Sequence, residues 1–335
     1  MVYIYKKIIQ GKPYYYLRIS KRIKGKIIVK DIAYLGNDVS KIGPKLEKLP
    51  VVYRKEVRKA YRDIKKYIES EYYLKKIKEL KLKDNDYLEK DLLDKVEAIK
   101  EHFNKKFLKL DEKTVNEAYK NFLIDFAFNT TSLEGNTITL MEADRLLREN
   151  LTPKDKNLRE VFDLQNTEKV FFEIINSKAS LDNEFIISVH DKLMENIDTR
   201  KGYRQHDIRV FKSAFEATPF IYIKADIGIL LKWYRKYEDE LHPLALAGIF
   251  HQKFEKIHPF SDGNGRTGRM LMIYILMKKK YPPLIIKKSR RADYLNALAK
   301  GNNVDLNNIE PKFYKDIVNY IAEELIDGYW NNFMV

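Results

Sequence analysis

The sequence predicts a mainly α-helical protein with a small β-meander at its N-terminus. After residue 51, apolar residues recur three and four positions apart, as they do on one face of a helix. Before residue 36, the chain instead holds three runs rich in β-branched and aromatic residues, with short glycine-containing turns between them. Long strands do not alternate with helices after residue 111, so a parallel α/β sheet is not expected there.

The three N-terminal runs are Val2–Ile9, Tyr14–Ile19 and Ile27–Tyr34. Because the turns between them are short, the runs are expected to pair as an antiparallel meander. A sheet this small needs a packing partner. Its tyrosines can pack against a following helix, or together with the lysines they can stack on a nucleic acid strand. We expect the tyrosines to pack against a helix.

Three units are expected along the chain: a basic β-meander module over 1–40, a charged helical linker or arm over 41–110, and a helical domain over 111–335. Residues 43–50 contain glycine and proline and are predicted to be a linker. The helical pattern that follows has many charge pairs but a thin apolar stripe, and it breaks at Asp84–Asp86.

The helical domain begins with a strong periodic signal. Val115, Tyr119, Phe122 and Phe126 are spaced four, three and four residues apart, which places them on one face of a helix. Thr139 is followed three residues later by a glutamate, the pattern of a capping box that opens the next helix.

The net charge of +15 lies entirely in the first third of the chain. Residues 1–50 carry a balance of +9 and residues 51–110 a balance of +6, whereas residues 111–335 are neutral. A positive surface attracts polyanions in a salt-dependent way, so nucleic acid is one expected partner of residues 1–110. The alternative is a solvated, lysine-rich appendage without a ligand.

The sequence contains no cysteine, which excludes disulfide scaffolds, thiolate zinc sites and cysteine nucleophiles. No run approaches the ~18 apolar residues of a membrane span, and the N-terminus lacks a secretory signal pattern. We therefore expect a soluble cytoplasmic protein with no membrane partner.

The most informative stretch is His258–Arg269, which reads H-P-F-S-D-G-N-G-R-T-G-R. A helix is predicted to end near Ile257, because Pro259 cannot continue it. Gly263–Gly265 is expected to be a loop whose residues tolerate positive φ, followed by a new apolar helix. Backbone amides that converge at the start of a helix form an anion site.

Four side chains flank this predicted anion site. Arg266 and Arg269 share one face of the new helix, and two guanidiniums suit a polyphosphate better than a single carboxylate. Asp262 supplies a carboxylate where phosphate-bound Mg²⁺ would sit. His258 can accept a proton near neutral pH. The combination indicates nucleotide chemistry without a P-loop motif.

The same stretch matches H-x-F-x-[DE]-G-N-G-R-x-x-R at every fixed position, and over 111–335 the chain resembles the Fic family. The resemblance implies a Fic-type helical bundle with a short β-hairpin flap. It also implies transfer of AMP from ATP, with Mg²⁺, to a Ser, Thr or Tyr hydroxyl of a target protein. By motif position it implies His258 as the catalytic base, Asp262 as the Mg²⁺ ligand, Gly263, Asn264 and Gly265 as the anion hole, Arg266 as the β-phosphate contact and Arg269 as the γ-phosphate contact.

A second match concerns regulation. Residues 130–136 read T-T-S-L-E-G-N and resemble the inhibitory motif [ST]-x-x-x-E-[GN] of the family. The resemblance implies that Thr130 and Glu134 are inhibitory and that Glu134 reaches Arg269 in place of the γ-phosphate. The alternative is an ordinary glutamate at a helix end, with Gly135 as the cap.

Two weaker matches complete the resemblance. Residues 202–223 resemble the family flap, and we expect a strand pair of Ile208–Phe211 with Phe220–Ile223 that docks the target segment by strand addition. Tyr294 and Asn302 match positions that line the adenosine pocket. Tyr294 can equally be a core residue on a helix face.

The remaining histidines do not show the spacing of metal ligands. His190 and His251 are predicted to be packing residues, and His190 is expected to point away from its neighbour Asp191.

The function expected from these observations is an autoinhibited protein adenylyltransferase restrained by Glu134. One alternative is removal of AMP by the same groups, and another is a nucleic-acid-associated regulator whose Fic core senses nucleotide. The expected partners are a target protein with an acceptor hydroxyl, a second copy of the chain as homodimer or self-modification target, and nucleic acid.

Overall fold

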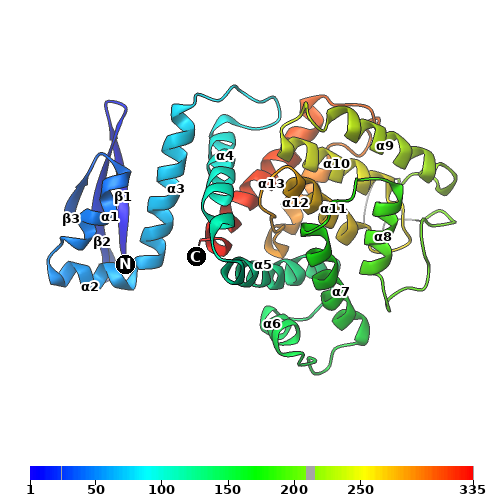
Figure 1. Ribbon diagram of the computed structural model, residues 1–335, viewed down its shortest axis with the longest axis horizontal. Coiled ribbons are helices and arrows are strands. Elements are labelled where there is room, and N and C mark those ends of the chain that lie inside the picture. The colour runs from blue at the N-terminus through cyan, green and yellow to red at the C-terminus, as the bar shows by residue number, and fades with distance from the viewer. Residues whose placement is uncertain (24, 209–215, 335) are drawn as a thin grey trace.

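The structure is a computed structural model that describes residues 1–23, 25–208 and 216–334. It is mainly helical with one three-stranded antiparallel sheet at the N-terminus, which confirms the predicted fold class (Figure 1). The strands are β1 (Val2–Ile9), β2 (Lys12–Ile23) and β3 (Lys26–Gly36). Over the described ranges the helices are α1 (Ile42–Glu47), α2 (Val51–Lys59), α3 (Tyr61–Glu79), α4 (Lys90–Lys105), α5 (Glu112–Leu133), α6 (Leu140–Glu149), α7 (Leu158–Ile175), α8 (Asn183–Leu193), α9 (Ile223–Tyr237), α10 (Pro243–Ile257), α11 (Asn264–Lys278), α12 (Arg291–Ala299) and α13 (Pro311–Asn332).

The sheet packs one face against α1–α3 and has a small core of its own. Buried and less buried side chains alternate along β1 and β2, as expected for strands covered on one side. The core residues come from all three strands and from the helices that follow. They include Val2, Ile4, Tyr15, Leu17, Leu35, Ile42, Leu46, Val57 and Ile64.

The tyrosines of the sheet lie mostly on the face away from these helices. Tyr15 is buried against α3, and its hydroxyl donates to Glu71 over 3.3 Å. Tyr14 and Tyr16 alternate with it on β2, and Tyr34 on β3 pairs with Tyr16 and is 53% exposed. The prediction that the aromatic residues pack against a helix is therefore wrong for most of them.

The predicted linker over residues 43–50 instead begins with the short helix α1. Ile42 and Leu46 lie one turn apart and are both buried against the sheet, so apolar burial stabilises this turn. Pro44 is tolerated because the amides of a first helical turn have no partner within the helix.

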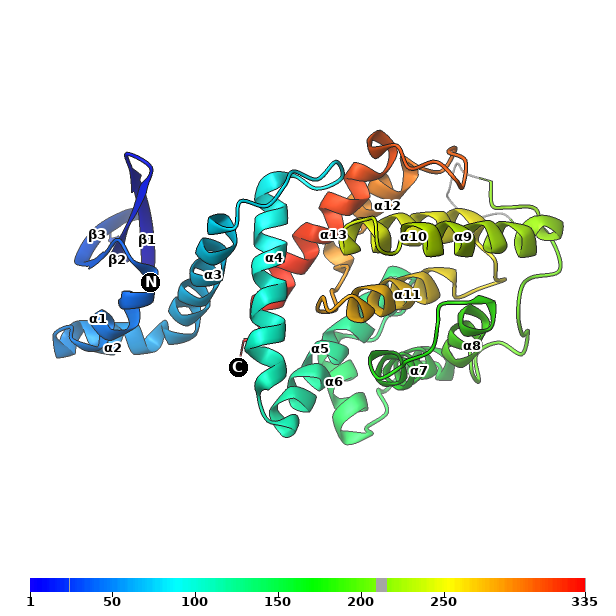
Figure 2. The same cartoon turned by 45° about the horizontal axis from the view of Figure 1, so that its top comes forward.

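The large core is formed by the helices from α4 to α13. Helices α10 and α11 are almost completely buried and pack against each other at its centre. Both views show the sheet at the end of the molecule remote from these two helices, with α3 and α4 between them (Figures 1 and 2). Helix α4 also belongs to the large core through residues such as Val96 and Ile99.

The expected strand pair of the flap is not formed as predicted. Residues 220–222 form a 3-10 helix, and α9 begins at Ile223, so the second strand is absent. Pro219, at the N-cap, and the turn that follows it favour this helical start over an extended strand. Most of the first strand, residues 209–211, lies outside the described residues. Within the described ranges, no helix has both the length and the apolarity that a membrane crossing requires.

Candidate functional site

The site is built around the loop between α10 and α11, where α10 ends at Ile257 as predicted. His258 follows in the left-handed conformation, with φ 51°, and its amide donates to Phe254 over 3.0 Å. This backbone conformation is unusual for a residue other than glycine and turns the chain sharply out of the helix. The imidazole is thereby placed beside the start of α11.

The environment of His258 favours a neutral imidazole with a defined tautomer. Its Nδ1 lies 3.2 Å from the backbone oxygen of Glu255, which can only accept, so Nδ1 carries the hydrogen. Nε2 is then the nitrogen without a hydrogen, and it is the one that can accept a proton. Burial lowers the pKa of His258 below its ordinary value. At neutral pH the side chain is therefore a base that can take up a proton.

Two side chains hold the loop in place. Asn264 accepts from the amide of Phe260 over 2.9 Å and donates to its carbonyl over 2.8 Å. The buried Arg204 donates through Nε to the carbonyl of His258 over 3.0 Å, and its amide donates to the carbonyl of Pro259 over 3.1 Å. The side chain of Asn264 is thus used within the loop, so only its backbone amide is available to a ligand.

Helix α11 starts two residues earlier in the motif than expected. Gly263 alone has a positive φ, 75°, and caps the helix, whereas Asn264 and Gly265 already form its first turn. Close packing also favours glycine at 263, because a Cβ there would lie 2.7 Å from Sδ of Met194. The first amides of the helix have no partner within it and face the loop, which is the arrangement of an anion site.

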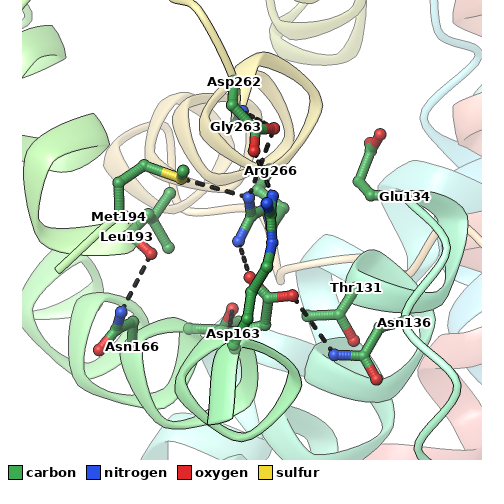
Figure 3. Close-up of polar contacts among 12 residues, drawn as sticks. Thr131, Glu134, Asn136, Asp163, Asn166, Leu193, Met194, Asp262, Gly263 and Arg266 are labelled. Atoms are coloured by element: carbon green, nitrogen blue, oxygen red, sulfur yellow. Dashed lines mark hydrogen bonds and ion pairs between the residues drawn. The ribbon is translucent and has the colours of Figure 1, made fainter. Parts of the chain in front are cut away.

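Arg266 is held by a buried carboxylate from another helix. Its guanidinium forms an ion pair with Asp163 on α7, and the exposed fractions of the two side chains are 3% and 11% (Figure 3). Asn136 donates to the same carboxylate over 3.4 Å. Asp163 was missed from sequence, because a single aspartate in a helix carries no local pattern.

Arg269 is held by the end of α5. Its Nε donates to the hydroxyl of Thr130 over 2.7 Å, and its Nη2 donates to the carbonyl of Thr130 over 2.9 Å. Nη2 also forms an ion pair with Glu134 at 2.8 Å. The Arg269 side chain is 2% exposed, whereas that of Glu134 is 44% exposed. Thr130, Glu134 and Arg269, which sequence reasoning grouped, thus lie together.

The carboxylate of Glu134 lies directly on the first turn of α11. A Cβ built on Gly265 would collide with this carboxylate and lie 2.9 Å from Nη1 of Arg269. In Figure 3, Glu134 lies to one side of the group formed by Asp262, Arg266 and Asp163, and no marked interaction joins it to that group. This carboxylate pairs with the guanidinium of Arg269 and lies against a helix N-terminus, where an anion such as phosphate is also favoured.

Asp262 is an ionised carboxylate at the rim of the site. Burial would raise its pKa, but Arg266 and Arg159 outweigh burial and hold the pKa below its ordinary value. Arg159 forms an ion pair with it, and Arg266 lies 3.8 Å away. Mg²⁺ in nucleotide sites often takes one or two protein carboxylates and completes its shell with phosphate oxygens and water. One ionised, 37% exposed carboxylate fits that mode.

Tyr294 and Asn302 come from α12 and the turn that follows it, not from the loop between α10 and α11. Tyr294 on α12 is 3% exposed, and its hydroxyl lies 2.5 Å from Nε2 of His251. Asn302 lies in the turn after α12, where its amide donates to Ala299 over 3.2 Å. The Tyr294 ring thus packs within the large helical core.

Two further side chains near the loop were not predicted from sequence to belong to the site. Glu255 on α10 is buried, one helical turn before His258, and burial raises its pKa to about 8. His190 on α8 stacks on Phe260 with ring centroids 3.6 Å apart and contacts the Asp262 carbonyl at 3.1 Å. Its Nδ1 lies 2.9 Å from Asp191, so the expectation that these neighbours point apart is wrong. Asp191 turns toward the ring because it also accepts from the Gly202 amide.

Comparison with known families finds a match for the part of the chain that contains this loop. Residues 180–276, which include the loop and most of α8–α11, match the Fic/DOC family. The chain contains a Fic domain. The match covers the middle of the helical domain and leaves the N-terminal sheet outside it.

Curated relatives carry the name protein adenylyltransferase Fic. The one from Nematostella vectensis is 28% identical over 251 residues, which are 72% of this chain and 56% of the relative. The one from Aedes aegypti is 27% identical over 231 residues, which are 62% of this chain and 45% of the relative. The chain thus spans about half the length of the curated relatives it matches.

Solved structures of Fic proteins have a similar fold. A Fic-domain signalling protein from Bacteroides thetaiotaomicron covers 70% of this chain and 93% of its own, with a TM-score of 0.62 and 24% identity. Fic-1 from C. elegans, residues 134–508, covers 72% of this chain and 70% of its own, with a TM-score of 0.59 and 22% identity.

Proposed function

We propose that this chain transfers AMP from ATP to a hydroxyl group of a protein and that Glu134 restrains the reaction. The observation that carries the proposal is a neutral, partly buried histidine beside a helix N-terminus flanked by two buried arginines. The names of the curated relatives support the same reaction.

The reaction is an in-line displacement at the α-phosphorus of ATP. The hydroxyl oxygen of a Ser, Thr or Tyr side chain forms a bond to this phosphorus, and the bond to the bridging oxygen breaks, so that pyrophosphate leaves. Nε2 of His258 takes the hydroxyl proton. This role is supported by the hydrogen on Nδ1 and by the lowered pKa of His258, which keeps the base neutral at pH 7.

The charge that develops on the phosphates needs fixed positive partners. The amides of Asn264 and Gly265 would bind the α- and β-phosphates, Arg266 the β-phosphate and Arg269 the γ-phosphate. The buried ion pair of Arg266 with Asp163 supports a preorganised guanidinium at this position. Asp262 would hold Mg²⁺, which neutralises phosphate charge when bound.

Inhibition by Glu134 follows from the contact it makes. Its carboxylate is paired with Arg269 and lies against Gly265, so it competes with the γ-phosphate for one guanidinium and one helix end. A triphosphate meeting this carboxylate would be repelled or displaced from the orientation that aligns the α-phosphorus with the base. Removing the carboxylate is expected to release the activity.

The test uses ATP labelled at either the α- or the γ-phosphate, with Mg²⁺ and a cell extract as the source of target. The Glu134→Gly variant should transfer the α-label to protein, while the γ-label leaves with pyrophosphate. Transfer of the γ-label to protein without the α-label would indicate phosphoryl transfer and overturn the proposal.

The control for the base is the double variant Glu134→Gly with His258→Ala. Loss of a general base typically slows a reaction by about 10²–10⁴-fold, so the α-label should disappear. Transfer at an unchanged rate in the double variant would show that His258 is not the base.

A further inference from the structure

The outer face of the N-terminal sheet, the one turned away from α1–α3, carries a continuous group of tyrosine rings. On β1, Tyr3 and Tyr5 alternate with the buried Val2 and Ile4 and so point to this face. The strand register places Tyr5 opposite Tyr16. We call this surface the tyrosine face; its five rings are Tyr3, Tyr5, Tyr14, Tyr16 and Tyr34.

The rings on this face lie close enough to act as one surface. Tyr16 and Tyr34 have centroids 5.3 Å apart, and Tyr14 and Tyr34 have centroids 6.4 Å apart and are stacked. The guanidinium of Arg18 lies 3.5 Å from the ring centre of Tyr5. Across three adjacent strands, aromatic rings that are tilted to one another and one guanidinium thus form a platform outside the packed core.

The charge around the platform is strongly positive. Residues 1–36 contain nine Lys and Arg residues and one acidic residue, Asp31. Asp31 pairs with Arg18 at 2.6 Å, and Lys6 pairs with Glu71 of α3. Among the other described basic side chains, all of them exposed, Lys7, Lys12 and Arg22 share the strand phase of the tyrosines, whereas Lys21, Lys26 and Lys30 fall in the opposite phase at the edges of the sheet.

We propose that the tyrosine face binds single-stranded nucleic acid. Aromatic platforms inside a positive field are how proteins hold single strands, because each base can stack on a ring while lysines and arginines contact the backbone. Stacked bases are hidden inside a duplex, so a face of rings favours unpaired strands. A protein partner would not need a balance of nine cations to one anion on the same 36 residues.

The platform is separate from the Fic site. The sheet lies at the end of the molecule remote from α10 and α11 in both views (Figures 1 and 2). It has its own small core with α1–α3. The proposal of nucleic acid binding therefore does not depend on adenylyl transfer. An experiment that contradicts one of the two proposals does not contradict the other. Together they would place the transferase core on strands of RNA or single-stranded DNA.

The test is fluorescence polarisation of the full chain with labelled oligonucleotides of about twelve units: oligo(dT), oligo(rU) and a duplex of similar length. We expect both or one of the single strands to bind more tightly than the duplex. Binding should weaken steeply as salt rises from about 50 to 200 mM, because contacts with backbone phosphates release counterions. A difference between dT and rU identifies DNA or RNA as the preferred strand.

Variants separate stacking from charge. Tyr16→Ala with Tyr34→Ala should weaken binding at least tenfold, whereas Tyr16→Phe with Tyr34→Phe, which keeps both rings, should bind like the wild type. The matched control is Tyr61→Ala, which removes an exposed ring on α3, outside the sheet. Lys7→Gln with Arg22→Gln should reduce the salt dependence, and Lys55→Gln with Lys59→Gln on α2 is its control.

Three results would overturn the proposal. The first is equal binding by wild type and the folded alanine pair, which would leave only charge attraction. The second is a duplex bound as tightly as the single strands. The third is no binding to any oligonucleotide at about 50 mM salt. Circular dichroism of each variant shows whether the sheet is retained.

Discussion

Arg266 and Arg269 lie one helical turn apart on α11 and are both almost completely buried, yet their partners differ in kind. Asp163, which holds Arg266, is an 11% exposed residue inside α7. Glu134, which holds Arg269, is 44% exposed and lies just after the end of α5. The first pair is part of the core, whereas the second has a partner that can leave toward solvent. Under the proposed function, this difference separates a permanent phosphate contact from a regulated one.

The largest expected effect is on stability. Replacing one partner of a buried ion pair leaves an uncompensated charge, so Asp163→Asn should lower the free energy of unfolding by about 3–5 kcal/mol. Glu134→Gln should lower it by less than about 1 kcal/mol, because the partner is partly solvated and Thr130 still accepts from Arg269. Urea unfolding followed by circular dichroism measures both. Similar losses for the two variants would remove the distinction between the pairs.

A second test concerns Glu255, the buried carboxyl near Arg269. Burial raises its pKa from the ordinary 4.5 to about 8. Between these values the unfolded chain is ionised while the folded chain keeps the proton, so the wild type loses stability as pH rises from 4.5 to 8. Glu255→Gln cannot titrate, and its stability relative to the wild type should increase by about 1–3 kcal/mol over this range.

Such an increase would mean that Glu255 is uncharged at neutral pH. Glu134 would then be the charged partner of Arg269, as the comparison of the two ion pairs assumes. Unfolding curves at several pH values between 4.5 and 8 provide the measurement. A relative stability of Glu255→Gln that falls with rising pH would instead mean that Glu255 is ionised and shares the guanidinium with Glu134.

The smallest expected effect concerns Thr130. Thr130→Val removes the hydroxyl that accepts from Nε of Arg269, a loss of about 0.5–1.5 kcal/mol for one hydrogen bond. Because Glu134 stays, transfer of AMP should rise only a few-fold, less than in Glu134→Gly. The control is Thr131→Val, whose hydroxyl donates to Ala127 and does not touch Arg269. Equal labelling rates in the two threonine variants would contradict the role given to Thr130.

How much of the site can be predicted from the sequence depends on how far apart in the chain the interacting residues lie. The loop residues and both arginines lie within His258–Arg269, so their joint placement follows from one helix end and one helix start. Asp163 lies 103 residues before Arg266, and no spacing rule connects a lone aspartate to a distant arginine. Arg204, which holds the loop backbone, was missed for the same reason.

The N-terminal sheet shows a different limit. Strand positions and turns were predictable from β-branched residues and glycines. Which face the tyrosines occupy was not, because tyrosines fill both phases of the alternation at Tyr14–Tyr16 and the helices could cover either side. In the structure Leu17 and Val2 are buried against the helices, so the tyrosines that alternate with them along the strands lie on the opposite face.

The most direct measurement of the central claim is the initial rate of protein labelling from α-labelled ATP by wild type, Glu134→Gly and Glu149→Gly. Glu149 is an exposed glutamate at the end of α6, so its variant removes a comparable carboxylate with no contact to Arg269. We predict a rate at least tenfold above wild type for Glu134→Gly and an unchanged rate for Glu149→Gly. Wild type labelling as fast as Glu134→Gly would contradict the claim that the half-exposed partner of Arg269 restrains the site.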